Sequence, residues 1–183
     1  MHAGLFSTLE SPAAGANRYP FNAWTSLGFI VPAIAMGLNG QYLASAASAS
    51  LSIVSFFWWW TQTPWLRTFD LWLVAFLFLF PPMMKAKLSH HHQLWVAGDL
   101  LILVAFFERT MSRANVGVIV AAAACSLQAL RGMHYSLCVT LIASVVIKAT
   151  VPKYGTGIFH VLTAAALACA SIIFAQERIL TLN

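Results

Sequence analysis

Charged side chains are scarce in this chain. Asp, Glu, Lys and Arg make up 8% of its 183 residues, whereas an average soluble domain carries about a quarter. Hydrophobic residues reach 60%, and the mean hydropathy is +0.78. This composition excludes an ordinary soluble domain and predicts an integral, multi-pass membrane protein.

Long stretches of the chain lack any charge. No Asp, Glu, Lys or Arg lies between Arg18 and Arg67, and because a span needs about 20 mostly apolar residues, this gap can hold two helices. Runs rich in Ala and Leu favour helices over the alternating strands of a barrel. We place seven spans near residues 21–39, 42–61, 66–84, 94–108, 115–130, 134–150 and 155–176. The expected fold class is therefore all-α and integral to the membrane, a seven-transmembrane-helix bundle.

Features that separate domains are also missing. The chain has no internal repeat, and its longest polar connection covers residues 81–93. We expect an N-terminal tail at 1–20 and a single seven-helix transmembrane domain at 21–183. The three histidines at 90–92 are expected in a loop, where adjacent side chains diverge and make a poor metal site.

The net charge of +5 resides mostly in the short loops. Basic residues in such loops favour contact with lipid headgroups over nucleic acid. The expected partners are membrane lipids and other membrane protein subunits, and no nucleic acid. The three cysteines all lie in apolar segments, which favours small buried side chains over a disulfide or a metal site.

A few polar side chains interrupt the apolar spans. Such groups are costly at membrane depth, so each is a candidate for a functional site. They are Asp70, Asp99, Lys148, His134 and His160, with Ser55 and Asn22 as neutral companions. Asp99 lies five residues into its predicted span, where water can reach it, and Lys148 ends its span and can extend toward the interface. His160 lies six residues into the last span.

The spacing of these groups resembles the CREST superfamily, the seven-helix membrane proteins that include alkaline ceramidases and progestin/adipoQ receptors. Ser55 precedes Asp70, Phe159-His160 lies in the last span, and the stretch "FNAWTSLGFIVP" at 21–32 opens the first span with Asn22. In that family a Ser, a His one turn later, an Asp eleven residues further on and a His-x-x-x-His pair build a zinc site for amide hydrolysis. The resemblance implies that Ser55 and Asp70 are supporting residues and that His160 is a metal ligand.

Two of the three histidine ligands that the resemblance implies are missing. Trp59 stands at the first ligand position and Thr156 at the second. An indole N–H donates a hydrogen bond but offers a metal no lone pair, whereas a catalytic zinc needs three protein ligands. The acidic residues that ceramidases carry before the first helix for calcium are missing too. We therefore expect no cofactor, with His160 the sole surviving ligand equivalent.

The favoured hypothesis is a catalytically inactive, ceramidase-like protein, a pseudoenzyme that serves as a lipid-contacting or structural subunit of a larger membrane complex. In it, tryptophan fills the space of a hydrated metal, and Asp70 is hydrogen-bonded to Ser55 or to a backbone N–H. The alternative is an active lipid amide or ester hydrolase in which Asp70, His160 and Asp99 rearrange around zinc. A weaker alternative is a pigment- or cofactor-binding subunit, because a lone histidine in an apolar helix can serve as an axial ligand.

Overall fold

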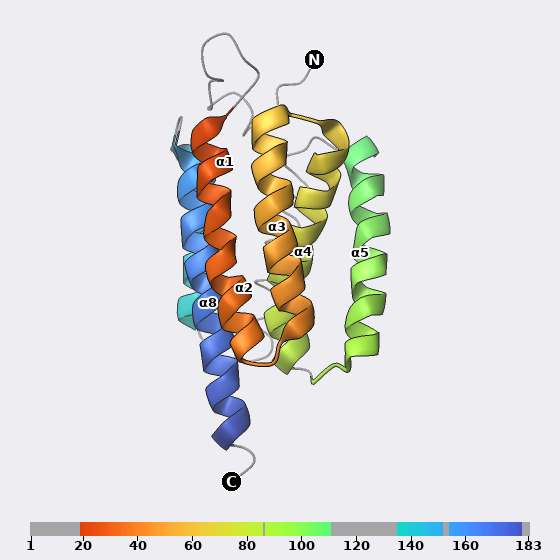
Figure 1. Cartoon of the computed structure of the whole chain (residues 1–183), viewed down its shortest axis with the longest axis vertical. Helices are drawn as coiled ribbons and strands as arrows, with labels where there is room; N and C mark the ends of the chain where they lie inside the picture. The colour runs from red at the N-terminus through yellow and green to blue at the C-terminus, as the bar shows by residue number, and fades with distance from the viewer. Residues whose placement is uncertain (1–18, 86, 111–134, 152–153, 181–183) are drawn as a thin grey trace.

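The computed structural model describes residues 19–85, 87–110, 135–151 and 154–180. Within these ranges every regular element is a helix (Figure 1), so the expected all-α fold is confirmed. In chain order the elements are α1 (Pro20–Ser26), the 3-10 helix η1 (Leu27–Phe29), α2 (Ile30–Leu38), α3 (Tyr42–Thr61), α4 (Pro64–Lys85), α5 (His90–Thr110), α7 (Tyr135–Thr150) and α8 (Gly155–Leu180).

Six of the seven predicted spans correspond to these helices. The first is the uninterrupted stretch of α1, η1 and α2, and the others are α3, α4, α5, α7 and α8. The predicted span at 115–130 and His134 lie outside the described residues. Among the described residues, three helical stretches are long and apolar enough to cross a membrane: Pro20–Leu38, Tyr42–Thr61 and Gly155–Gln176. These three helices indicate a membrane protein.

Tight turns set the antiparallel order of the first helices. Gly40, between α2 and α3, has a φ of 72°, a left-handed conformation that glycine adopts without steric cost. Gln62 ends α3 in the same region, with a φ of 56°. Pro64 then opens α4, where its missing N–H removes no helical hydrogen bond. Helices α3 and α4 are therefore close neighbours along much of their length.

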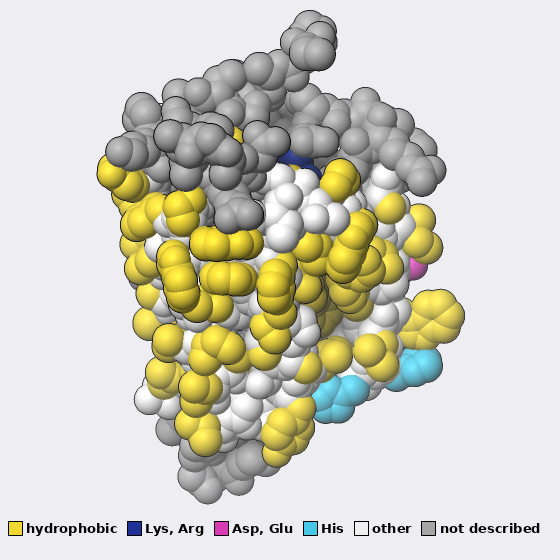
Figure 2. All heavy atoms as spheres, turned by 45° about the horizontal axis from the view of Figure 1, so that its top comes forward, with side chains coloured by type: hydrophobic (Ala, Val, Ile, Leu, Met, Phe, Trp, Pro, Cys, Tyr) yellow, Lys and Arg dark blue, Asp and Glu magenta, His cyan; other side chains and the backbone are white. Residues whose placement is uncertain are grey.

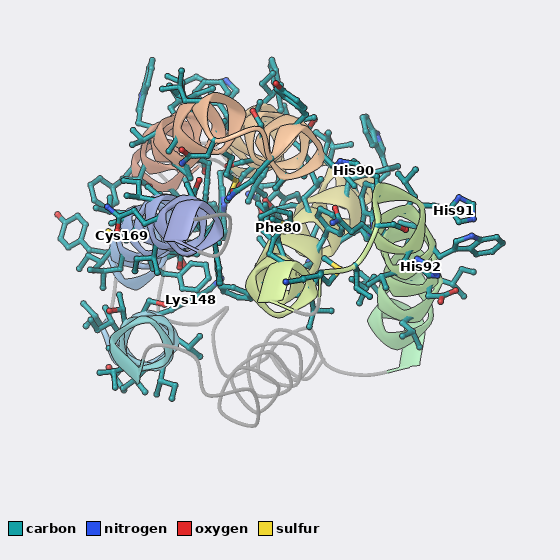
Figure 3. The ribbon with its side chains drawn as sticks, turned by 90° about the horizontal axis from the view of Figure 1, so that it is seen from below. Phe80, His90, His91, His92, Lys148 and Cys169 are labelled. Carbon is teal, nitrogen blue, oxygen red and sulfur yellow. The ribbon has the colours of Figure 1, made fainter. Side chains whose placement is uncertain are left out.

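Helix α8 packs against α1, α2, α4 and α7, and α3 packs against α1, α2 and α4. Large apolar side chains fill the space between them, among them Phe29, Met36, Leu51, Leu77 and Leu167. Helix α5 packs against α4 and lies at the edge of the bundle in the end-on view of Figure 3. The polar residues of interest therefore divide between a central group and a peripheral helix.

The connection between α4 and α5 is shorter than its sequence indicated. The Ser89 hydroxyl accepts a hydrogen bond from the backbone N–H of His92, at 3.4 Å, and so caps the start of α5. The expectation that residues 90–92 form a loop is wrong, because these histidines make the first turn of α5. Asp99 is consequently the tenth of 21 residues in its helix, and the expectation of a position near the helix end is wrong as well.

Candidate functional site

Polar side chains from α1, α3, α4 and α8 meet inside the bundle. Ser26, Ser55, Asp70 and His160 are all at least nine-tenths buried. Together with Thr25 and Trp59 they are called here the His160 cluster. Burial of so many polar groups is costly unless they bond to one another, so their contacts decide what the cluster can do.

Ser26 is the hub of this cluster. Its Oγ lies 2.9 Å from Oγ of Ser55, 3.3 Å from Nδ1 of His160 and 2.7 Å from the backbone carbonyl oxygen of Asn22. A helix brings Ser26 over the Asn22 carbonyl because the two residues are four positions apart. One hydroxyl thus connects α1 with both α3 and α8.

The imidazole of His160 is held from the side of α1. Oγ1 of Thr25 lies 3.1 Å from the same Nδ1 that faces Ser26. Both hydroxyls also donate to the backbone carbonyl oxygen of Asn22, which lies 3.1 Å from Oγ1 of Thr25 and 2.7 Å from Oγ of Ser26. Asn22, a candidate from the sequence, therefore lies next to the cluster and contacts it through its backbone carbonyl.

The carboxyl group of Asp70 lies at the other end of the cluster. Ser55 is the polar side chain on α3 that lies beside it. Its Oδ1 atom is buried and has no hydrogen-bond partner among the described residues. Polar groups therefore follow one another in the order Asp70, Ser55, Ser26, His160, and the bonds of Ser26 join α1 to α3 and α8.

Trp59 lies beside His160, with the two ring centroids 6.1 Å apart. On its other side the indole meets the ring of Tyr19 edge-on, at 5.6 Å between centroids. Nε1 of Trp59 is buried and donates to no acceptor in the part of the chain that the structure describes. Thr156, at the second lost ligand position, is buried in α8 one turn before His160. The indole thus lies next to the imidazole without donating a hydrogen bond to it.

The structure separates Asp99 from the other sequence candidates. Ser55, Trp59, Asp70 and His160 converge, whereas Asp99 is exposed on α5, which packs against α4. Lys148 also differs from expectation. Figure 3 places it between α7 and α8, and its Nζ lies 4.7 Å from the centroid of the Phe159 ring. This ammonium contacts the neighbour of His160 instead of extending toward the interface.

Sequence reasoning missed Thr25 and Ser26. Both follow Asn22 by about one helical turn, within the stretch "NAWTS". Such hydroxyls usually bond to a carbonyl of their own helix, and these two do so as well. The available signal was their shared face with Asn22, a residue already singled out.

The cluster does not fit the zinc site that the sequence resemblance implies. His160 and Asp70 are its ligand-type side chains, and Nδ1 of His160 already faces two hydroxyls. Across the described ranges, no group of three or more His, Cys, Asp or Glu side chains is placed to hold a metal ion. A catalytic zinc uses three protein ligands and one open position, and this donor set supplies at most two.

No protein-family model, curated protein or solved structure matches the chain. The fold and the cluster therefore define its class by themselves. In the residues that the structure describes, it is all-α, with three helices able to cross a membrane and a buried polar network that joins α1, α3 and α8.

Proposed function

We propose that this chain is a seven-transmembrane protein with an alkaline-ceramidase-like fold that has lost its metal site and serves as a lipid-contacting or structural subunit of a larger membrane complex. The position of Trp59 carries the proposal. Its ring lies beside His160, where the resemblance requires an imidazole. The hydrolytic site is thereby replaced by a packed aromatic contact.

The convergence of the retained residues supports the family assignment within this proposal. Ser55, Asp70 and His160 lie on three different helices, and 105 positions separate Ser55 from His160 in the sequence. Their meeting through Ser26 is the arrangement that a retained scaffold needs. A buried polar network of this kind also fixes the relative positions of the helices that contribute to it.

The outer surface supports the lipid-contacting role. Figure 2 shows apolar side chains spread over the visible face of the bundle. Val31, Ile34 and Val161 are each more than half exposed. Exposed apolar patches of this kind indicate contact with a membrane or with other proteins. Neither contact requires a catalytic centre.

The test is the metal content of the full chain, purified without chelators. We expect far less than one zinc ion per chain and no hydrolysis of a ceramide substrate. Stoichiometric zinc that is lost in His160→Ala, together with hydrolysis, would establish the metal-dependent hydrolase instead. The matched control is His91→Ala in the exposed first turn of α5, which identifies zinc held adventitiously by the histidines at 90–92.

The size of the protein in mild detergent tests the subunit role. Extracted from its native membrane, the chain should migrate as part of an assembly well above its mass of 20.0 kDa. A monomer that remains fully folded would contradict this role.

A further inference from the structure

A carboxylate lies on the outer face of α5, at the middle of the helix. Asp99 is the tenth of 21 residues and is exposed. A helix of this length spans about 31 Å, close to the roughly 30 Å of a bilayer core. Figure 1 shows α5 standing nearly parallel to α3 and α4, so its middle lies level with theirs. Helix α5 is not one of the three described helices that are long and apolar enough by themselves to cross a membrane. Its place in the bilayer comes from the seven-helix fold proposed above.

The orientation of α5 about its own axis is fixed by its opposite face. Val96, Ala97 and Leu100 pack against the hydrophobic core. In addition, Nε1 of Trp72 on α4 donates to the backbone carbonyl of Ala97 at 2.8 Å. Asp99 cannot turn inward without breaking these contacts.

The exposed face of α5 forms a continuous stripe. His91, Trp95, Gly98, Asp99 and Ile102 recur at helical spacing, and all are exposed; they are called here the α5 stripe. Nε1 of Trp95 donates to Nε2 of His91 at 2.8 Å, and Figure 3 shows His91 on the outer side of the bundle. A Cβ atom added to Gly98 would meet nothing within 4 Å. The stripe is therefore flat and open at Gly98, directly beside the carboxylate.

A carboxylate that faces lipid at this depth is costly, and such groups normally pair with another group. We infer that the α5 stripe docks a transmembrane helix of a partner membrane protein, and that this helix carries a Lys or Arg opposite Asp99. Gly98 lets the partner's backbone approach closely, as small residues do in membrane helix pairs. The Lys or Arg follows from charge complementarity, because a cation opposite Asp99 pairs with its carboxylate. Trp95 and His91 provide polar groups near the helix end, where the interface lies.

A second copy of this chain is a poor occupant of the stripe. Because Asp99 lies at the middle of α5, a two-fold pair of stripes would bring two carboxylates together in either direction, and like charges repel. This inference rests on the proposed role as a subunit and deepens it by naming the partner's surface and chemistry.

The probe is a synthetic transmembrane helix of Leu and Ala with one central Lys, compared with the same helix carrying Leu at that position. Energy transfer is measured in phosphatidylcholine vesicles between the labelled full chain and each peptide. We expect the Lys helix to bind at least about threefold more tightly, the fold-change of a weak interhelical polar contact. Asp99→Asn should abolish this preference.

A second variant tests the close approach. Gly98→Leu should weaken binding of the Lys helix without unfolding the chain, because the added side chain starts in open space. Ala165→Leu adds the same bulk to an exposed position of α8 and should leave binding unchanged. Equal binding of both peptides to the wild-type chain, or an unchanged preference in Asp99→Asn, would overturn the inference. Self-association of two labelled chains that is lost in Asp99→Asn would overturn it as well, in favour of a homodimer.

Failure of the inference and failure of the proposed function give different results. A native assembly that keeps its size in Asp99→Asn refutes the α5 stripe as the docking surface and leaves the subunit role intact. A monomeric wild-type chain refutes the subunit role, and the peptide measurement then judges the chemistry of the stripe separately.

Discussion

The indole of Trp59 and the imidazole of His160 lie 6.1 Å apart between ring centroids, with an angle of 59° between their planes. This contact joins α3 to α8 at the depth where Ser26 joins α1 to both. Because an indole has no lone pair for a metal, a tryptophan here turns a possible ligand pair into an aromatic contact. The neighbouring hydroxyls form a buried polar network around the imidazole.

Restoring the two missing imidazoles tests this geometry. The double variant Trp59→His, Thr156→His should bind about one zinc ion per chain, because three imidazoles match a catalytic zinc. Thr156 and His160 are one turn apart on α8 and so share a face. Zinc titration of the purified variant measures the gain, and its melting temperature should rise with zinc, since binding stabilises the folded state.

The matched control for this double variant adds His160→Ala, which returns the count to two imidazoles and should remove the gain. A double variant that folds but binds no more zinc than the wild-type chain would show that the three positions do not converge on one point.

Ser26→Ala tests the hub of the His160 cluster. The change leaves Oγ of Ser55 and Nδ1 of His160 without their shared hydroxyl, and losing a partner for buried polar groups costs about 1–3 kcal/mol. The free energy of unfolding in detergent should fall by this amount. Ser50→Ala removes a hydroxyl from an exposed position of α3 and should change stability by less than about 0.5 kcal/mol. Equal effects of the two variants would show that the network does not stabilise the fold.

Alanine substitution of two helical glycines should change the stability of the chain in opposite directions. A Cβ atom on Gly155 would lie 2.9 Å from the backbone oxygen of Ile147 and 3.0 Å from that of Lys148. Backbone atoms cannot easily yield, so Gly155→Ala should destabilise the chain by about 1–3 kcal/mol. Gly98 meets nothing within 4 Å, and Gly98→Ala should stabilise it by about 0.5–1 kcal/mol, the helix preference of alanine. Thermal unfolding of both variants measures the signs, and a stabilised Gly155→Ala chain would contradict the close approach of α7 and α8.

The helices were predictable from the sequence because the hydropathy of a segment depends only on the residues that it contains. Counting apolar residues located six of the observed helices, yet it placed the start of α5 too late. The cause is Ser89, whose cap allows three histidines to form a helical turn. Hydropathy does not register a cap, so Asp99 was predicted near a helix end and lies at the middle of α5.

The candidate site was predictable only through its resemblance to a family pattern. Nothing local connects Ser26 with His160, which are 134 positions apart. The pattern identified Ser55, Trp59, Asp70 and His160, and the structure brings them together. It could not identify Thr25, Ser26 or the contact of Lys148 with Phe159. Hydroxyls bonded to their own helix, and a lysine at a helix end, look the same in sequence whether or not they reach a distant ring.

The hydrogen bond from Trp72 to Ala97 fixes the helix that carries Asp99. Trp72→Phe keeps the aromatic bulk and removes the N–H, so the free energy of unfolding should fall by about 1 kcal/mol. The loss should be concentrated in α5, because α5 packs against α4, and amide hydrogen exchange should accelerate in α5 more than in α8. Trp65→Phe on the same helix is the control, since that side chain is 61% exposed and should leave exchange unchanged. Equal acceleration in α5 and α8 would contradict a local role for the bond, and no acceleration in either helix would mean that α5 is held by apolar packing alone.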